Sequence, residues 1–306
     1  MKRIARRAGF ATSLTLAVCI STFATIAFAD VEFRRQYADS RYGQVHMLMS
    51  RPAGAEASHT PMVCLAPNPM SGRYYRMFMA EMGRDRIMIA PDYPGVGDSD
   101  PPDAPPDLAG YAGAMADVLD ALGFGGTDRR KVDVCGYHTG AMVAIELAIE
   151  RPDLVNRLVL AGVPFYTGAE RQRQFDENVV AAPLEEEFDS LRKSWEFTVS
   201  DRQPGVTLER GYDNFVDVLK PKYRHHWPYR AVFSYPAEGR ALLVSQPVLI
   251  LNTHGGLEDQ TRAFAALLPD ATVIEIPELY HGVFDVGAAL LAGHARPFLD
   301  GEEVAH

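Results

Sequence analysis

Several residue types and patterns are scarce in this chain of 306 residues. It has three cysteines and two tryptophans, and neither a low-complexity tract nor an internal repeat stands out. Basic residues are outnumbered, with 30 Lys and Arg against 40 Asp and Glu and a net charge of −10. Phosphate backbones are bound by basic patches, so this balance argues against nucleic acid as a partner. No glycine-rich phosphate loop or dinucleotide fingerprint occurs, so no organic cofactor is expected.

The cysteines outside the N-terminal segment give no sign of a disulfide framework. Cys64 and Cys135 each lie inside an apolar stretch typical of a buried strand. Buried free thiols are common in such positions, and we expect that state here. A bridge stays open as the alternative, because an oxidising compartment permits one and the two strands could be neighbours.

The first 29 residues differ from the rest of the chain. Four basic residues stand near the start, an apolar run covers residues 8–26, and Ala27-Phe28-Ala29 has the A-x-A form of a cleavage site. This pattern predicts a signal peptide at residues 1–29, an exported protein in the periplasm or outside the cell, and no stable membrane insertion after cleavage. An uncleaved anchor is the alternative, because the apolar run nearly reaches membrane-spanning length.

Beyond residue 30, short apolar strand patterns alternate with helical ones, which indicates a mostly parallel sheet with helices on both faces. The alternation stops over residues 164–246, where aromatic and charged helical stretches contain no clear strand, and resumes at residue 247. We therefore expect an α/β core formed by residues 30–163 and 247–306, with residues 164–246 inserted as a helical lid.

Four motifs follow one another along the core. In chain order they are Ala66-Pro67-Asn68-Pro69, Asp92-Tyr93-Pro94-Gly95-Val96-Gly97-Asp98-Ser99, Gly136-Tyr137-His138-Thr139-Gly140 and Tyr280-His281-Gly282. In this order and spacing the chain resembles the α/β-hydrolase superfamily over nearly all of its length after residue 29. The resemblance implies an eight-stranded sheet, an oxyanion loop at the first motif, a nucleophile elbow at the third and a catalytic histidine at the fourth.

The chain departs from the family pattern at two positions of the catalytic triad. His138 stands where the family has a nucleophilic serine. Gly256 stands where the family places an aspartate, and the nearest carboxylates, Glu258 and Asp259, come two and three residues later. Of the three triad positions, His281 alone keeps the family residue.

The elbow's function does not depend entirely on serine. A glycine-flanked turn between strand and helix forces its central residue into a strained conformation, which exposes the side chain. The backbone N–H groups of Asn68 and Thr139 would form a two-donor oxyanion hole whatever the side chain at position 138 is. The histidine side chain has an unperturbed pKa of about 6.5, so it is largely neutral near pH 7. The neutral imidazole carries a lone pair that can attack a carbonyl or activate water.

We expect hydrolysis of an ester, thioester, lactone or related small carbonyl compound, with His138 at the elbow and His281 as base. Pro67, Tyr137 and His254 are expected at the substrate pocket, and Glu258 or Asp259 as a possible acid. A cofactor-free lyase on the same scaffold and a non-catalytic binding protein are the alternatives. A zinc site on His138, His254 and His281 is a further hypothesis, but loop spacing does not show convergence, so no metal is expected.

Overall fold

The computed structural model describes residues 31–302 except 127–129, 182 and 281. The predicted signal peptide at residues 1–29 therefore lies outside the described residues, as does His281. Within that part of the chain, no helix is both long enough and apolar enough to cross a lipid bilayer.

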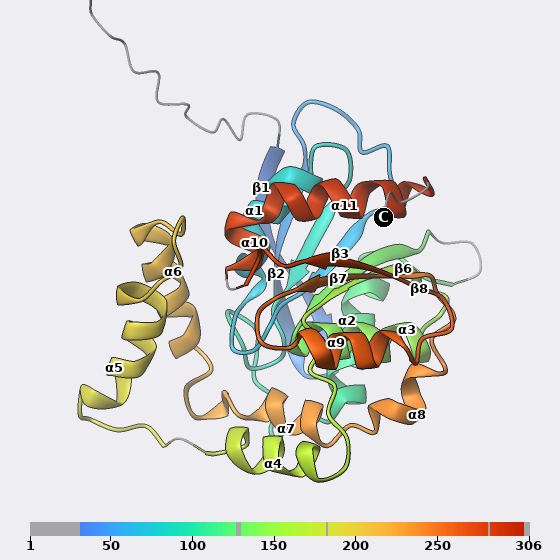
Figure 1. The fold of residues 1–306 in the computed structure, drawn as a ribbon. Coiled ribbons are helices and arrows are strands. Elements are labelled where there is room, and N and C mark those ends of the chain that lie inside the picture. Colours follow the sequence, from blue (N-terminus) through green and yellow to red (C-terminus); the bar gives the residue numbers. More distant parts are fainter. Residues whose placement is uncertain (1–30, 127–129, 182, 281, 303–306) are drawn as a thin grey trace, which may run out of the picture.

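A single eight-stranded sheet organises the described residues (Figure 1). Its strands are β1 (Val31–Ser40), β2 (Gly43–Pro52), β3 (Met62–Leu65), β4 (Met88–Pro91), β5 (Val132–Tyr137), β6 (Val155–Ala161), β7 (Val248–Thr253) and β8 (Ala271–Ile276). They lie in the order β1-β2-β4-β3-β5-β6-β7-β8. β2 pairs antiparallel with β1 and β4, and the pairs from β4 through β8 are parallel. The predicted mostly parallel eight-stranded sheet is confirmed.

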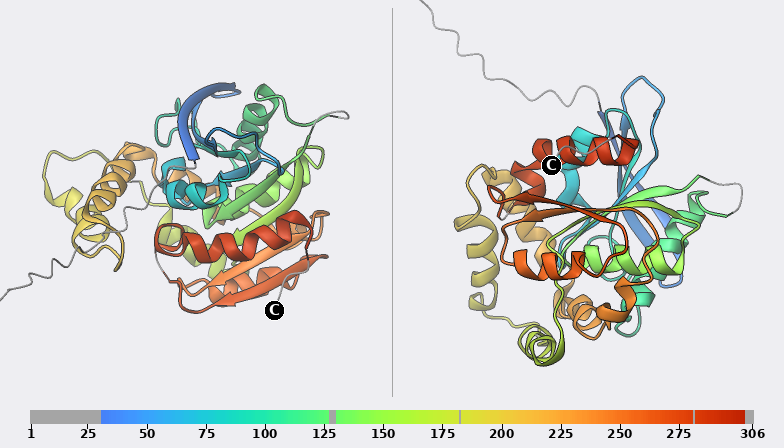
Figure 2. Two further views of the ribbon diagram at one scale, coloured as in Figure 1. Left: turned by 90° about the horizontal axis from the view of Figure 1, so that it is seen from above. Right: turned by 45° about the vertical axis from the view of Figure 1, so that its right-hand side comes forward.

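Helices cover both faces of the sheet (Figures 1 and 2). One face carries η1 (Gly72–Tyr75), α1 (Arg76–Met82), α10 (Val283–Val286) and α11 (Ala288–Asp300), and the other carries α2 (Leu108–Ala121), α3 (Thr139–Glu150) and α9 (Glu258–Ala265). Asp107 begins α2 by accepting a hydrogen bond from the backbone N–H of Gly110 at 2.7 Å. Such a cap satisfies a backbone donor that has no partner within the helix.

The central strands are apolar on both sides because side chains alternate between the two helical layers. In β5, Val132 and Val134 pack with α2 and α3, whereas Cys135 packs with α1 and α11. Cys135 is the register partner of Cys64 in β3, and both thiols are free and buried, as expected. The central strands β3, β4, β5 and β7 are buried on both faces, which explains their nearly continuous apolar sequences.

Between β6 and β7 the chain leaves the sheet and forms a helical insertion, residues 162–247. It contains α4 (Gly168–Asn178), α5 (Asp189–Trp195), the π-helical turn η2 (Glu196–Ser200), α6 (Leu208–Leu219), η3 (Lys222–Arg224), α7 (Trp227–Phe233) and α8 (Ala237–Ala241). Figures 1 and 2 show α4, α7 and α8 close to the body, while α5 and α6 stand to one side of it. The regular elements described in this segment are all helical, and its expected role as a lid stays a prediction.

Candidate active site

The turn between β5 and α3 holds His138 in a strained backbone conformation. His138 has φ 51° and ψ −118° and directly precedes the first residue of α3. A side chain at Gly136 would collide with the carbonyl of Gly140, and one at Gly140 would collide with the carbonyl of Leu65 in β3. Both glycines are therefore required sterically, and the sharp turn they permit brings position 138 to the carboxyl end of the sheet.

The imidazole of His138 packs against its neighbours at that edge. Its ring centroid lies 4.0 Å from that of Tyr137, with 35° between the ring planes. A methyl group at Gly162, just after β6, would lie 2.6 Å from Cδ2 of His138 and 2.9 Å from Nε2. The Cδ2–Nε2 edge of the ring therefore faces the Gly162 backbone, and the opposite edge carries Nδ1. Glycine at 162 leaves the space that the larger side chain needs.

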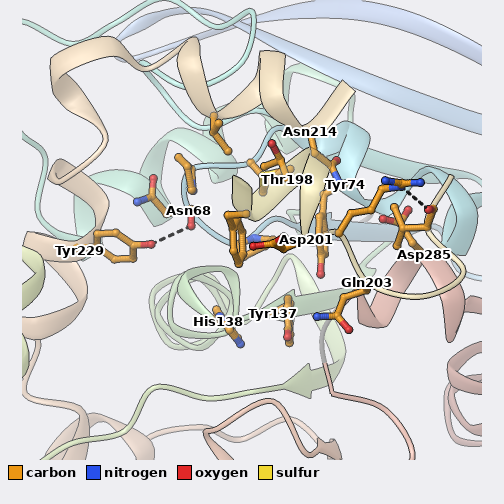
Figure 3. A pocket seen from close by; sticks show the side chains of 18 residues that line it. Asn68, Tyr74, Tyr137, His138, Thr198, Asp201, Gln203, Asn214, Tyr229 and Asp285 are labelled. Carbon is orange, nitrogen blue, oxygen red and sulfur yellow. Dashed lines mark hydrogen bonds between the residues drawn. The ribbon is translucent and has the colours of Figure 1, made fainter. Parts of the chain in front are cut away.

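A cavity of about 300 Å³ opens above the elbow, between the body and the insertion (Figure 3). The body contributes Pro67, Asn68, Pro69, Met70, Tyr74, Tyr137, His138, Gly282 and Asp285, and the insertion contributes Phe197, Thr198, Asp201, Arg202, Gln203, Val206, Asn214, Val218 and Tyr229. This volume is at the lower end of those typical for small-molecule sites.

The loop after β3 is fixed by the insertion. Asn68 is 7% exposed, its Nδ2 donates to the His225 carbonyl at 2.7 Å, and its own carbonyl accepts from the Tyr229 hydroxyl at 3.1 Å. The carbonyl acceptor fixes the orientation of the Asn68 amide, since only NH₂ can face it. Oδ1 is buried and has no hydrogen-bond partner among the described residues.

The predicted site residues divide into two groups. Pro67, Asn68, Tyr137 and His138 line the cavity together, and Thr139 is buried at the start of α3 beside them. Gly282 also lines the cavity. The preceding residue, the predicted base, lies outside the described residues, so its distance to position 138 is not defined.

The second group follows β7, and none of its members lines the cavity. Hydrogen bonds from the backbone amides of Glu258 itself and of Gly256 hold the pKa of Glu258 below its ordinary value. Asp259 points to solvent and pairs with Arg262 at 2.8 Å. His254 Nε2 lies 3.5 Å from Glu275 Oε2, so that imidazole is directed to the sheet edge.

Glu275 in β8 is a carboxylate that the sequence did not single out. It accepts two hydrogen bonds from Arg262, at 2.8 and 2.9 Å, and further bonds from Asn252. The Arg262 bonds, together with those from Asn252 and the nearby imidazole of His254, lower the pKa of Glu275 to about 2. No local motif marks it, because β7 and β8 bring Asn252 and Glu275 opposite each other only when the sheet forms.

Two buried acidic contacts tie α6 to the body beside the cavity. Arg210 Nε lies 2.9 Å from Asp285 Oδ1 in α10, with both side chains largely buried. Asp217 accepts from the Ser71 backbone N–H at 3.1 Å and from its hydroxyl at 2.5 Å. Burial raises the pKa of both carboxyl groups, against the opposing effect of these partners.

A cluster of His46, Asp92 and Asp98 lies away from the cavity. Its ligand-type atoms lie within 4.8 Å of one another. Asp92, however, accepts from His46 Nδ1 at 2.9 Å, and Asp98 pairs with Arg73 and Lys220. Two adjacent cations oppose a bound metal ion, so we interpret the cluster as the structural anchor of the loop that contains it.

Comparisons with known proteins identify relatives of this chain and of its fold. The family model described as alpha/beta hydrolase family matches residues 62–306. A 2-hydroxymuconate semialdehyde hydrolase from Pseudomonas sp. (strain CF600) is 37% identical over 89 residues, 29% of this chain and 30% of that protein. The chain spans less than a third of the length of the curated relatives it matches, from 22% to 30%.

Two solved structures show the same fold. The enol-lactonase from Burkholderia xenovorans LB400 has a TM-score of 0.69 at 15% identity, covering 87% of this chain and 100% of that one. An esterase from Exiguobacterium antarcticum has a TM-score of 0.68 at 15% identity, with coverage of 87% and 100%. At this identity the likeness concerns the fold alone.

Proposed function

Because the chain belongs to the alpha/beta hydrolase family, we propose that it hydrolyses a small ester, thioester or lactone in the cavity beside His138. One observation carries the proposal: a strained elbow presents an imidazole to a cavity of about 300 Å³ at the carboxyl end of the sheet. Strain of this kind is retained where the surrounding structure holds it and is concentrated at functional sites. The 2-hydroxymuconate semialdehyde hydrolase named above, 37% identical over 89 residues, supports hydrolysis as the reaction class.

The proposed reaction uses His138 as a covalent nucleophile. The neutral imidazole attacks the substrate carbonyl carbon, and the carbonyl π electrons move to oxygen. Collapse of this intermediate breaks the bond to the leaving group, which takes up a proton from protonated His281, and leaves an acyl-imidazolium that keeps its ring N–H. Water then attacks the acyl carbon and gives a proton back to His281, and release of the acid restores the neutral imidazole. Nδ1 is the nitrogen assigned to attack, because the edge that carries Nε2 packs on Gly162.

The remaining roles in the proposal follow the family pattern. His281 transfers protons to the leaving group and from water. The backbone N–H groups of Asn68 and Thr139 stabilise the oxyanion, supported by the position of Asn68 in the cavity wall and of Thr139 at the N-terminus of α3. The helical insertion acts as a lid over the cavity, and residues 1–29 direct export to the periplasm or the exterior.

Intact-mass spectrometry tests this mechanism. Wild-type protein incubated with an activated acyl ester should gain the acyl mass on residue 138 and turn over at neutral pH. His138→Ala should lose both the adduct and the turnover, by about 100-fold or more. His59→Ala, in a partly exposed loop histidine away from the cavity, is the matched control and should keep both.

The outcomes separate the alternatives. Turnover that survives His138→Ala contradicts the nucleophile. Turnover without an adduct, lost in the same variant, indicates water activation instead. Ligand binding with no turnover in wild-type protein indicates a binding protein, and isotope exchange at a carbon acid without ester cleavage indicates a lyase.

A further inference from the structure

The insertion brings an ionisable group to the cavity that the hydrolytic mechanism does not use. Asp201 follows the π-helical turn η2, and its backbone N–H donates to the Glu196 carbonyl at 2.8 Å. Turns of this kind are rare and are frequent at functional sites. Figure 3 shows Asp201 between the insertion and the pair Tyr137 and His138.

The other charged groups near the cavity are engaged by the protein. Arg202 donates from Nε to the Val206 carbonyl at 3.0 Å and from Nη1 to the Val199 carbonyl at 2.8 Å. Asp285 is paired with Arg210 at 2.9 Å. No hydrogen bond or ion pair of the Asp201 carboxylate occurs within the described part of the chain, so its charge is available to a ligand.

The polar wall of the cavity also contains two buried acceptor oxygens that have no partner among the described residues. Asn68 is more than nine-tenths buried and lines the cavity; one N–H of its amide donates to the His225 carbonyl, and Oδ1 has no partner among the described residues. Asn214 Oδ1 on α6 is likewise buried and without a partner there. A ligand that fills this space satisfies these oxygens with positive charge or with N–H and O–H groups.

Aromatic rings complete the surroundings of the carboxylate. Tyr74 and Tyr137 are stacked, with centroids 5.9 Å apart and 7° between the planes, and Tyr229 and Phe197 add rings from the insertion. Ring faces attract organic cations within about 6 Å of the centroid. The net charge of −10 draws cations toward the molecule and repels anions.

We propose that the cavity selects a substrate carrying an organic cation, such as an ammonium-bearing ester, with Asp201 as the charge partner and the aromatic walls around it. This inference names a substrate class for the hydrolase site and rests on the proposed function. Binding of the cation, however, can be measured without any turnover. A carboxylate-bearing substrate is disfavoured by the same groups.

The test is equilibrium binding with an isosteric pair of probes. Choline and its neutral carbon isostere, 3,3-dimethylbutan-1-ol, are titrated against the full chain by calorimetry, and ethanolamine distinguishes a primary from a quaternary ammonium. Choline or ethanolamine should bind about tenfold more tightly than the neutral alcohol. Asp201→Asn should reduce that preference to less than about twofold while leaving the affinity for the alcohol unchanged.

The control is Asp213→Asn, which removes the same charge from an exposed position of α6 that does not line the cavity. It should keep the preference. Equal binding of the cation and the alcohol, no binding of either cation, or a preference that persists in Asp201→Asn overturns the proposal. Failure of ester turnover with the charge preference intact overturns the proposed function instead.

Discussion

At the scale of single residues, the histidine at the elbow depends on a glycine 24 positions later in the chain. His138 and Gly162 meet because β5 and β6 are parallel neighbours and both turns lie at the carboxyl end of the sheet. An imidazole is longer than a serine hydroxyl and needs the space that a side chain at 162 would occupy. The two residues are therefore sterically dependent on each other, although nothing in the sequence links position 138 to position 162.

Gly162→Ala tests that dependence. Gly162 and Gly168 both have φ +53°, but nothing lies within 4 Å of a methyl group at 168, whereas one at 162 meets the imidazole. Gly168→Ala should lower the free energy of unfolding by about 1 to 2 kcal/mol through backbone strain alone. Gly162→Ala should cost more and reduce acyl transfer at least about tenfold, because the ring must move.

Urea denaturation and the acyl-transfer assay measure both effects. Equal unfolding midpoints in the two variants, with acyl transfer preserved in Gly162→Ala, would show that the imidazole does not rely on this space.

At the scale of elements, α6 of the insertion is joined to the body by two buried acidic contacts beside the cavity. The pair Arg210 and Asp285 connects α6 to α10, and Asp217 connects α6 to Ser71. α5 and α6 stand apart from the sheet (Figure 1), and Val218 of α6 packs partly buried against the core of the body, so these polar contacts help to position the wall that carries Asp201.

Asp285→Asn should loosen this wall. The substitution leaves the buried charge of Arg210 uncompensated, which costs up to about 3 to 5 kcal/mol. Movement of α6 away from the body relieves this cost, because it exposes the guanidinium to water. We expect faster proteolysis within residues 179–207 and faster amide hydrogen exchange in α6, with the sheet unchanged. Glu170→Gln breaks the exposed pair with Arg173 and should leave both rates unaltered. Unchanged rates in Asp285→Asn would contradict this tether.

At the scale of the whole molecule, a carboxyl group buried at the end of the sheet opposite the cavity makes the stability of the fold depend on pH. Asp133 in β5 is fully buried, accepts from Asn156 Nδ2 at 2.8 Å, and has no partner for Oδ2 among the described residues. Burial raises its pKa to about 7, against the lowering effect of the Asn156 hydrogen bond. In the unfolded state the carboxyl group has a pKa of about 3.9. At a pH between these two values, the folded state therefore keeps a proton on Asp133 that the unfolded state releases.

This difference sets the sign of a pH dependence. Between pH 4 and about 7 the folded state binds more protons at Asp133, so its contribution to the free energy of unfolding falls as pH rises, by at most about 1.4 kcal/mol per unit. Asp133→Asn should remove this slope and raise stability at pH 7 and above. Denaturation midpoints at pH 5 and pH 8 measure it.

Asp103→Asn, in the exposed loop before α2, is the matched control and should preserve the wild-type difference between pH 5 and pH 8. An Asp133→Asn protein that keeps the wild-type slope would show that other groups cause it. At lower pH the exposed Glu275, whose pKa is about 2, acts in the opposite direction, because its bonds to Arg262 are lost as it is protonated.

Much of the architecture was predictable from the chain alone. Strand and helix periods are local, so continuous apolar runs predicted the parallel sheet, and the loss of that pattern located the helical insertion. The two glycines around position 138 predicted the elbow, because a backbone turn of this kind excludes side chains at those places. That position 138 holds a histidine, and not the serine of the family pattern, was equally visible in the sequence.

Only the tertiary structure decided which groups share the cavity. Asp201, Asp285 and Tyr229 line the same cavity as His138, and Gly162 lies against the edge of its ring, because parallel strands end at one edge of the sheet and residues of the insertion lie beside that edge. The environments of Glu275 and Asp133 are likewise set by register and burial, which depend on partners distant in sequence. The local sequence determines where strands and helices form and where a turn requires glycine. The protonation of a buried group, its access to solvent and its side-chain contacts depend on the assembled fold.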